Sequence, residues 1–227
     1  MKSEIILALD VDSLTKAKYF VNELYPEIKT FKVGLRLFTA TGAKVIKMIH
    51  KKGGKVFLDL KFFDIPNTVA GAVRQAVRQR VAMLTLHISG GQVMLKAAVA
   101  AAKNEAKKLK QKRPLLIGVT VLTSKAVNPG NVLALAKAGI KSGLDGVVCS
   151  AQEAKHLRNK IRGRFVIVTP GIRAKGTVKD DQKRTATVSE AIQAGSDFLV
   201  LGRPILEAKD PLRAVESLKS DAPKKGD

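Results

Sequence analysis

The densest group of residues that could carry out acid–base chemistry is the segment 59–68, which reads DLKFFDIPNT. Residues two apart on a β-strand point to the same face, so Asp59 and Lys61 face the same way. A buried carboxylate and a buried ammonium are each unstable alone, and Lys61 lies between Asp59 and Asp64 in the sequence. This spacing leaves two interpretations open: a charge network that does chemistry, or an ion pair that only closes the mouth of the fold.

A second group of residues is suited to binding phosphate. Two apolar runs near the end of the chain are each followed by glycine and arginine: Gly171 with Arg173, and Gly202 with Arg203. Glycine backbone N–H groups and helix N-termini are common phosphate ligands. Between the pairs runs a polar stretch, 174–184, whose length and composition favour a lid that closes over a ligand through Gln182. A surface loop without a function is the alternative.

The elements that must position these residues are short apolar runs spread over the whole chain. We interpret as strands the segments Glu4–Asp10, Thr30–Gly34, Lys55–Lys61, Met83–Ile88, Leu115–Val121, Gly146–Ser150, Phe165–Thr169 and Asp197–Gly202. Most lack strict alternation, as expected for parallel strands covered on both faces. Amphipathic stretches separate them, for example Val69, Val73 and Val77 at every fourth residue.

This alternation of strand and helix predicts an α/β fold, a single (β/α)8 TIM barrel with roughly 28 residues per unit. An open doubly wound sheet is the competing fold, but it would rarely contain so many regular units without a cofactor fingerprint. The composition does not change along the chain, so we expect one barrel domain over residues 1–219. Residues 220–227, SDAPKKGD, are predicted to form a flexible C-terminal tail.

Active sites of such barrels lie at the carboxyl ends of the strands. In this chain those ends are rich in polar residues: Asp10, Lys32, Asp59, Lys61, His87, Thr120, Thr123, Ser124, Arg173 and Arg203. We expect His87 to pack behind the site, His50 and His156 to be solvated, and Cys149 to be a small buried apolar residue. Asp12 and Ser13 are typical of a helix N-cap.

The charge of the chain bears on its partners. It has 41 Lys and Arg against 19 Asp and Glu, a formal net charge of +22, and only 4% aromatic residues. The basic residues are dispersed and lack accompanying aromatics, so we expect no specific nucleic-acid partner. A single cysteine excludes a disulfide framework, and no apolar run reaches the length of about 20 residues that spans a bilayer. With no signal peptide recognisable, the expectation is a cytoplasmic protein without a membrane partner.

At these residues the sequence resembles the orotidine 5′-phosphate decarboxylase family. The resemblance covers nearly the whole chain and rests on LALDVD around Asp10, FKVG around Lys32, FLDLKFFDIPNT, VLTS, VTPGIR, DDQKR and LGRPI. The pattern Asp-x-Lys-x-x-Asp-Ile-Pro-x-Thr is highly specific, whereas Gly-Arg alone would be weak. The resemblance implies decarboxylation of orotidine 5′-monophosphate to uridine 5′-monophosphate and CO₂, the last step of de novo UMP synthesis, with no metal and no organic cofactor.

The resemblance also implies a role for each matching residue. Lys32, Asp59, Lys61 and Asp64 would form a catalytic network in which Lys61 stabilises a carbanion at C6 and protonates it. The implied substrate contacts are Asp10 and Lys32 on the ribose, Thr123 and Ser124 on the pyrimidine, Gln182, Gly202 and Arg203 on the phosphate, and Asp59, Thr68, Pro170 and Arg173 nearby. The family works as a homodimer, so Asp64 and Thr68 would reach into the partner's site.

Two other functions remain as alternatives. Sugar-phosphate lyases such as the keto-gulonate phosphate decarboxylases and the hexulose-phosphate synthases share the barrel but hold Mg²⁺ with acidic residues at the strand ends. The sequence Asp-Ile-Pro-Asn-Thr and the predicted lid residue Gln182 count against them. A non-enzymatic nucleic-acid binder is motivated by the net charge alone.

Overall fold

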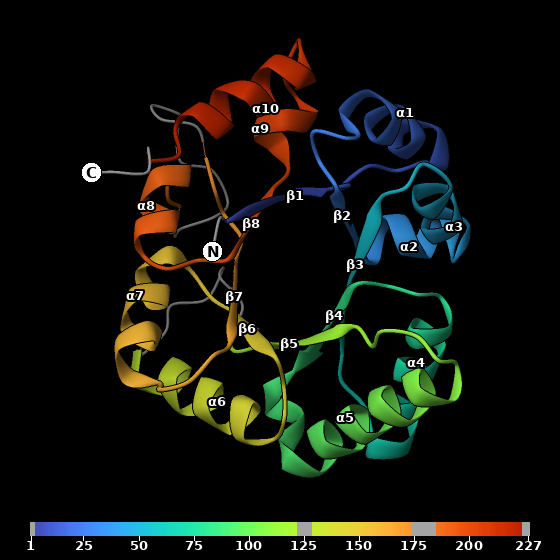
Figure 1. The fold of residues 1–227 in the computed structure, drawn as a ribbon, viewed down its shortest axis with the longest axis vertical. Coiled ribbons are helices and arrows are strands. Elements are labelled where there is room, and N and C mark those ends of the chain that lie inside the picture. Colours follow the sequence, from blue (N-terminus) through green and yellow to red (C-terminus); the bar gives the residue numbers. More distant parts are fainter. Residues whose placement is uncertain (1–2, 122–128, 174–184, 224–227) are drawn as a thin grey trace.

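The computed structural model describes residues 3–121, 129–173 and 185–223, and its centre is a closed barrel of parallel strands (Figure 1). The strands follow one another around the barrel in chain order, and β1 closes it by pairing with β8. Their bounds are β1 Glu4–Ala8, β2 Thr30–Gly34, β3 Lys55–Phe62, β4 Met83–His87, β5 Leu115–Val119, β6 Gly146–Val148, β7 Val166–Thr169 and β8 Phe198–Leu201. The prediction of a (β/α)8 TIM barrel is confirmed.

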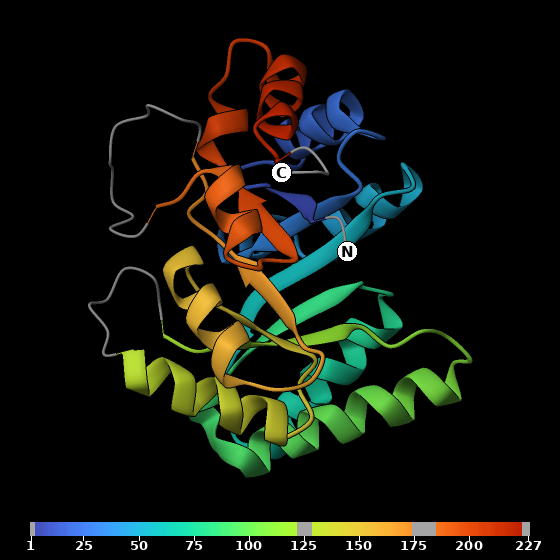
Figure 2. The ribbon, with the colours of Figure 1, turned by 60° about the vertical axis from the view of Figure 1, so that its left-hand side comes forward.

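Helices surround the barrel on its outside, as Figures 1 and 2 show from two directions. They are α1 Leu14–Leu24, α2 Leu35–Thr41, α3 Lys44–Lys51, α4 Pro66–Arg78, the short 3₁₀ helix η1 Ile88–Gly90, α5 Gly91–Lys108, α6 Pro129–Lys141, α7 Ala151–Lys160, α8 Val188–Gln193, α9 Arg203–Leu206 and α10 Pro211–Ser220. In the described part of the chain, none of them has the length and apolar character needed to cross a membrane.

Two apolar layers hold the barrel together. The inner layer fills the barrel with side chains from six strands: Ile6, Ala8, Phe57, Met83, Ile117, Val168 and Val200. The outer layer lies between the sheet and the helices and includes Val69, Val73 and Val77 of α4, all at most 1% exposed, as their spacing predicts. Since neighbouring residues of a strand point into different layers, both faces of the strands are apolar.

Strand ends differ from the sequence prediction where the backbone enters a helix. β6 ends at Val148 because Ser150, predicted to end it, is the N-cap of α7. The hydroxyl of Ser150 accepts a hydrogen bond from the N–H of Glu153, whose carboxylate accepts from the N–H of Ser150. Ser13 caps α1, as predicted: its hydroxyl accepts a hydrogen bond from the N–H of Lys16, whereas Asp12 forms an ion pair with Arg36.

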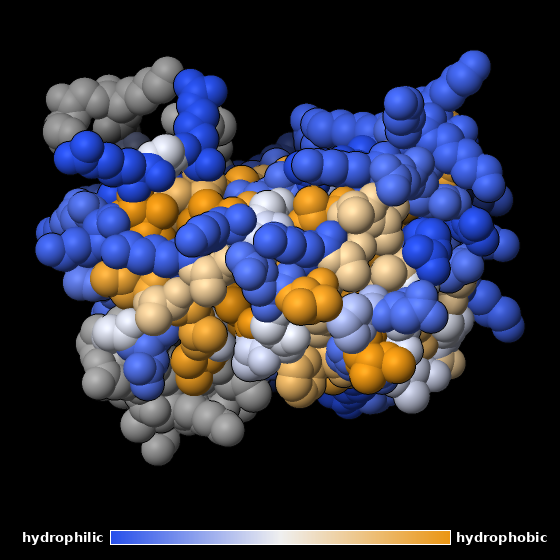
Figure 3. Space-filling model, turned by 90° about the horizontal axis from the view of Figure 1, so that it is seen from below, coloured by the Kyte–Doolittle hydropathy of each residue, from blue (hydrophilic) through white to orange (hydrophobic). Residues whose placement is uncertain are grey.

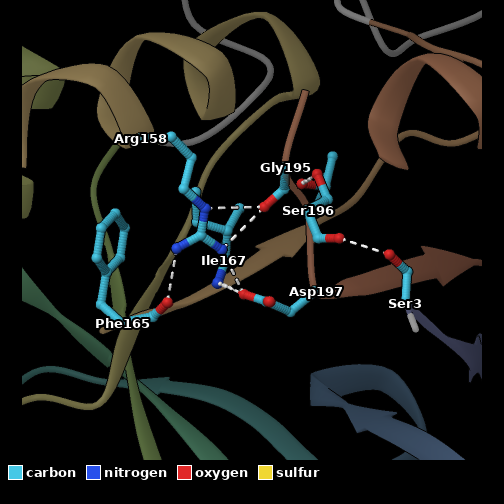
Figure 4. Close-up of polar contacts among 8 residues, drawn as sticks. Ser3, Arg158, Phe165, Ile167, Gly195, Ser196 and Asp197 are labelled. Carbon is cyan, nitrogen blue, oxygen red and sulfur yellow. Dashed lines mark hydrogen bonds and ion pairs between the residues drawn. The ribbon is translucent and has the colours of Figure 1, made fainter. Parts of the chain in front are cut away.

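The amino ends of β7 and β8, on the side away from the predicted site, are joined through Arg158 (Figure 4). Its guanidinium donates to the carbonyl oxygens of Phe165 and Gly195 and lies 2.5 Å from Oδ2 of Asp197. The same carboxylate oxygen accepts from the N–H of Ile167 at 2.7 Å. One arginine therefore satisfies backbone groups of two consecutive βα units.

The C-terminal helix extends beyond the predicted domain limit at residue 219. α10 includes Ser220, and Oδ2 of Asp221 accepts a hydrogen bond from the N–H of Ser189. Residues 224–227, the second half of the predicted tail, lie outside the described residues.

The surface is mixed in character. Figure 3 shows the side of the molecule at the bottom of Figure 1, where hydrophobic residues reach the surface in patches between projecting hydrophilic side chains. The large exposed apolar residues of the described chain are Tyr19, Leu35, Phe63, Ile65, Val93 and Leu109.

Candidate active site

A cavity of about 250 Å³ opens at the carboxyl ends of the strands. Apolar side chains from five strands line its floor: Phe57, Val119, Val148, Val168 and Val200. The charged and loop residues around it are Asp10, Lys32, Asp59, Lys61, Pro170, Gly171, Arg173, Gly202 and Arg203. The barrel interior therefore supplies an apolar surface for a ring, and the strand ends supply charges of both signs.

The charged residues form an alternating chain across the ends of β1, β2 and β3. Nζ of Lys32 lies 3.3 Å from Oδ1 of Asp10 and 3.4 Å from Oδ2 of Asp59. The other carboxylate oxygen of Asp59, Oδ1, lies 2.9 Å from Nζ of Lys61. The side chains of Lys32 and Asp59 are each 12% exposed, so water screens this pair weakly. Such a chain holds two ammonium groups at fixed positions beside an apolar cavity.

The electrostatics of Asp59 follow from its neighbours. Burial alone would raise the pKa of its carboxyl, but the charges of Lys32 and Lys61 and hydrogen bonds from Lys61 and Thr85 act more strongly in the other direction. The pKa of Asp59 is therefore below its ordinary value. Asp59 is therefore ionised at neutral pH and is the ion-pair partner of both Lys32 and Lys61.

The backbone at Lys61 departs from regular strand geometry. Lys61 has a φ of +52°, in the left-handed region that a lysine rarely adopts, and the pairing of β3 with β4 shifts register between Leu58 and Phe62. The N–H of Lys61 donates to Oγ1 of Thr85 at 2.9 Å, and this hydroxyl donates to Oδ1 of Asp59 at 3.0 Å. The Asp59–Lys61 pair is thus built on a bulge and not on a flat strand.

Thr85 was not among the residues singled out in the sequence. The run MLTLH contains the signal that could have found it, because alternate residues of a strand point the same way. Met83 belongs to the inner apolar layer and His87 is the predicted neighbour of the site, so Thr85 between them also points inward.

The glycine and arginine residues predicted to bind phosphate, those after β7 and those after β8, all line the cavity. Gly202 precedes α9, and a Cβ at Gly202 would lie 3.4 Å from Oδ2 of Asp10. The residues that follow β7 are held by two backbone hydrogen bonds to Ala186. The N–H of Arg173 donates to the Ala186 carbonyl at 2.9 Å, and the N–H of Ala186 donates to the Gly171 carbonyl at 3.3 Å. Arg173, which lines the cavity, and Ala186 therefore lie side by side. Gln182 itself, like Thr123 and Ser124, lies outside the described residues.

Two predicted site residues do not line the cavity of this chain. Asp64 is exposed, and its Oδ1 accepts a hydrogen bond from the N–H of Ile65 at 2.6 Å. Thr68 is exposed in the first turn of α4. The chain turns outward after the bulge at Lys61, so among the described residues the ion-pair partner of Lys61 is Asp59 alone.

Exposed apolar side chains lie in the same part of the molecule as Asp64 and Thr68. They are Leu35, which follows β2, Phe63 and Ile65, which follow β3, and Val93 at the start of α5, each 58% to 73% exposed. We call these four residues the apolar rim. They are separated in sequence and belong to no periodic pattern, so sequence analysis could not identify them as a group.

The remaining predicted residues are placed as follows. The ring of His87 packs edge-on against Phe63, and burial together with the charge of Lys61 lowers its pKa. Cys149 is buried and His156 is exposed, as expected. His50 is partly buried in α3, not solvated, and burial together with the charge of Arg80 lowers its pKa.

No group of three or more His, Cys, Asp or Glu residues is arranged to hold a metal ion within residues 3–121, 129–173 and 185–223. The acidic residues of the cavity instead have lysine partners. Asp10 and Asp59 are joined through Lys32.

Comparison with known proteins relates the chain to one family. The family model described as "Orotidine 5′-phosphate decarboxylase / HUMPS family" matches residues 3–218. The orotidine 5′-phosphate decarboxylase of Moorella thermoacetica is 44% identical over 232 residues, which cover 97% of this chain and 92% of the relative. That of Coxiella burnetii is 45% identical over 229 residues, with 96% of each chain covered.

Solved structures agree with this relationship. The crystal structure of orotidine 5′-phosphate decarboxylase from Lactobacillus acidophilus matches with a TM-score of 0.85 and 35% identity, covering 97% of this chain and 99% of that one. An uncharacterized conserved protein from Geobacillus kaustophilus matches with a TM-score of 0.83 and 31% identity, covering 96% and 99%.

Proposed function

Because this chain belongs to the orotidine 5′-phosphate decarboxylase / HUMPS family and is a carboxy-lyase, we propose that it converts orotidine 5′-monophosphate to uridine 5′-monophosphate and CO₂. The observation that carries the proposal is the alternating chain of Asp10, Lys32, Asp59 and Lys61 at the mouth of an apolar cavity. A cytoplasmic location, expected from the sequence, stays a prediction.

The proposed reaction needs a cation at one carbon atom of the pyrimidine. The bond between C6 and the carboxylate carbon breaks, CO₂ leaves, and the electron pair stays on C6, where the ring delocalises it poorly. Nζ of Lys61 supplies positive charge at this position and then transfers its proton to C6, forming the new C6–H bond. Solvent returns a proton to the amine. The proposed step uses no metal and no organic cofactor.

Asp59 keeps Lys61 ready for this role. Its carboxylate lies 2.9 Å from Nζ of Lys61 and holds this group in place at the cavity. Lys32 pairs with the second oxygen of the same carboxylate and limits its rotation. A fixed charge does not have to reorganise during the reaction, which is the main advantage of a preorganised site.

The rest of the substrate is assigned to the other side of the cavity. Asp10 and Lys32 are the proposed ligands of the ribose hydroxyls, and Gly202 and Arg203 those of the phosphate. Their supporting observation is position: all four line the same cavity as Lys61. Pro170 and Arg173, at the edge of the same cavity, are proposed neighbours of the bound nucleotide.

Three further ligands, proposed from the resemblance alone, lie outside the described residues. Gln182 would bind the phosphate, and Thr123 and Ser124 would bind the pyrimidine edge.

We also propose that the working unit is a homodimer with Asp64 and Thr68 contributed across the interface. Both side chains are exposed and lie outside the cavity of their own chain. Two residues of the apolar rim, Phe63 and Ile65, flank Asp64 in the chain, and large exposed apolar side chains are typical of protein interfaces. When a second copy of the chain covers this rim, the Asp64 of each chain would approach the Lys61 of the other and supply a second carboxylate there.

The test of the function is the loss of ultraviolet absorbance of orotidine 5′-monophosphate with purified protein that has been treated with a chelator. We expect rapid loss with uridine 5′-monophosphate as the product, and none with Lys61→Ala. A folded protein that shows no loss contradicts the proposal. Activity that appears only when Mg²⁺ is restored, on a sugar phosphate substrate, would instead establish the metal-dependent lyase.

A further inference from the structure

Thr85 of β4 is completely buried and does not line the cavity, yet it contacts both members of the Asp59–Lys61 pair. Its hydroxyl accepts a hydrogen bond from the N–H of Lys61 at 2.9 Å and donates one to Oδ1 of Asp59 at 3.0 Å. The directions are fixed by chemistry, because an amide N–H can only donate and an ionised carboxylate can only accept. A single hydroxyl thus joins the backbone of one residue to the side chain of the other.

The position of Thr85 in the sheet explains why this hydroxyl is needed. Leu58 pairs with Leu84, and the next paired residues are Phe62 and Leu86. Three residues of β3, 59 to 61, therefore lie opposite a single residue of β4, which is Thr85. The regular backbone ladder cannot satisfy a bulge of this size, and the side chain of Thr85 takes the place of a backbone partner for the N–H of Lys61.

The bulge in turn directs the lysine. Lys61 adopts φ +52°, which is unfavourable for a residue with a side chain and persists only where surrounding contacts hold it. Its N–H bond to Thr85 is such a contact. The same hydroxyl also holds the Asp59 carboxylate, so Thr85 orients both members of the Asp59–Lys61 ion pair.

We propose that Thr85 is a positioning residue, whose hydroxyl holds the left-handed bulge that presents the ammonium of Lys61 to Asp59 and to the cavity. The inference rests on the proposed function in so far as turnover is used to measure it. A threonine that merely fills space would be replaceable by valine, which has nearly the same shape. A positioning threonine would be replaceable by serine, which keeps the hydroxyl.

The decisive comparison is between these two variants. Thr85→Val is expected to lower kcat by about 10- to 100-fold, the effect of losing hydrogen bonds that involve a charged group, with KM changed less than about threefold. Thr85→Ser is expected to keep kcat within about threefold of the parent.

Thr169→Val is the matched control. Thr169 is a completely buried threonine at the end of β7, and its hydroxyl bonds to that of Ser196 at 2.6 Å, away from Lys61. The variant removes a buried hydroxyl from the same barrel and should leave kcat unchanged. If Thr85→Val fails to fold, Thr85→Cys, with a weak S–H donor in a similar volume, is measured in its place and is expected to show the same loss.

A second measurement does not depend on turnover. Titration of the Asp59 carboxyl by carbon NMR should show a higher pKa in Thr85→Val than in the parent, because the ionised form has lost a hydrogen-bond donor. Thr85→Ser and Thr169→Val should titrate like the parent. A shift of the Lys61 amide resonance in Thr85→Val alone would report the loosened bulge.

The outcomes separate the two proposals. A folded parent protein that does not decarboxylate the nucleotide overturns the proposed function, and the Asp59 titration still decides the role of Thr85. Parent-like kcat and parent-like Asp59 titration in Thr85→Val overturn the positioning role. So does an equal loss of kcat in Thr85→Ser or Thr169→Val, because it would reflect general destabilisation of the barrel.

Discussion

The ammonium of Lys61 lies 2.9 Å from Oδ1 of Asp59, and both residues lie on β3 where its pairing with β4 shifts register. On a regular strand, side chains two residues apart point the same way but stand almost 7 Å apart at their bases. The left-handed backbone at Lys61 changes this direction. The left-handed backbone therefore sets the direction from which the ammonium of Lys61 approaches Asp59.

Lys61→Ala should lower kcat by at least about 10³-fold, because the variant loses both the stabilising charge and the proton donor. The fold should survive, since the Lys61 side chain is 30% exposed and Asp59 keeps Lys32 as a partner. Steady-state kinetics and circular dichroism check both statements. Lys103→Ala, on an exposed position of α5, is the control; activity in Lys61→Ala comparable to the control would exclude the assigned role.

Arg203→Ala should discriminate between substrates with and without a phosphate. Removing a charged phosphate ligand should lower kcat/KM for orotidine 5′-monophosphate by at least about 100-fold, and for orotidine, which has no phosphate, by only a few fold. The measurement is the ratio of the two kcat/KM values in each protein. Equal losses for both compounds would place Arg203 away from the phosphate.

Mixing two inactive variants should restore activity if the site is shared between subunits. In a heterodimer of Lys61→Ala and Asp64→Ala chains, one site carries both substitutions and the other carries neither. Random exchange of equal amounts should therefore give about a quarter of the parent activity. Activity is measured after exchange, with unmixed variants as controls; a mixture that stays inactive despite proven exchange would show that Asp64 acts within its own chain.

The ionised form of Asp59 should contribute to stability in a pH-dependent way. Its pKa is lowered in the folded protein, so the contribution is fully present above the unfolded value of about 4 and is lost as pH falls through the folded value. Asp59→Asn should accordingly be less stable than the parent at neutral pH, and the difference should shrink below about pH 4. Urea unfolding from pH 7 to pH 3 measures it. A difference that does not vary with pH would contradict the lowered pKa.

Arg158→Met should destabilise the barrel without affecting the reaction. The guanidinium bonds to two carbonyls and to Asp197 at the amino ends of β7 and β8, and its loss should cost about 2 to 3 kcal/mol of unfolding free energy (Figure 4). Chemical denaturation and kcat are the two measurements. Arg213→Met, at an 85% exposed position, should change neither. A large fall in kcat for Arg158→Met, measured at a temperature where the variant is folded, would contradict a purely structural role for Arg158.

The sequence predicts the barrel well because its signal is repeated around the molecule. Runs such as Leu115–Val119 are apolar on both faces, as expected for buried parallel strands. The errors lie at strand ends. Ser150 could extend a strand or cap a helix, and the choice depends on the reciprocal contact with Glu153, which is a property of the folded backbone.

The candidate site is predictable as far as residue type and strand position determine it. Asp10, Lys32 and Asp59 could be placed together because parallel strands end at the same edge. The register shift opposite Thr85 could not be predicted from the sequence, because it depends on how many residues of β3 fit beside β4. The apolar rim was missed because its members gather only through the fold.

The pairing of β1 with β8 leaves each of the eight described strands with a neighbour on both sides. Strands as apolar as Phe198–Leu201 would otherwise present free N–H and carbonyl groups on which the strands of another molecule could assemble. In the closed barrel these groups are occupied within the chain. Folded molecules therefore meet one another through helices, loops and side chains, and strand-to-strand aggregation requires the barrel to open first.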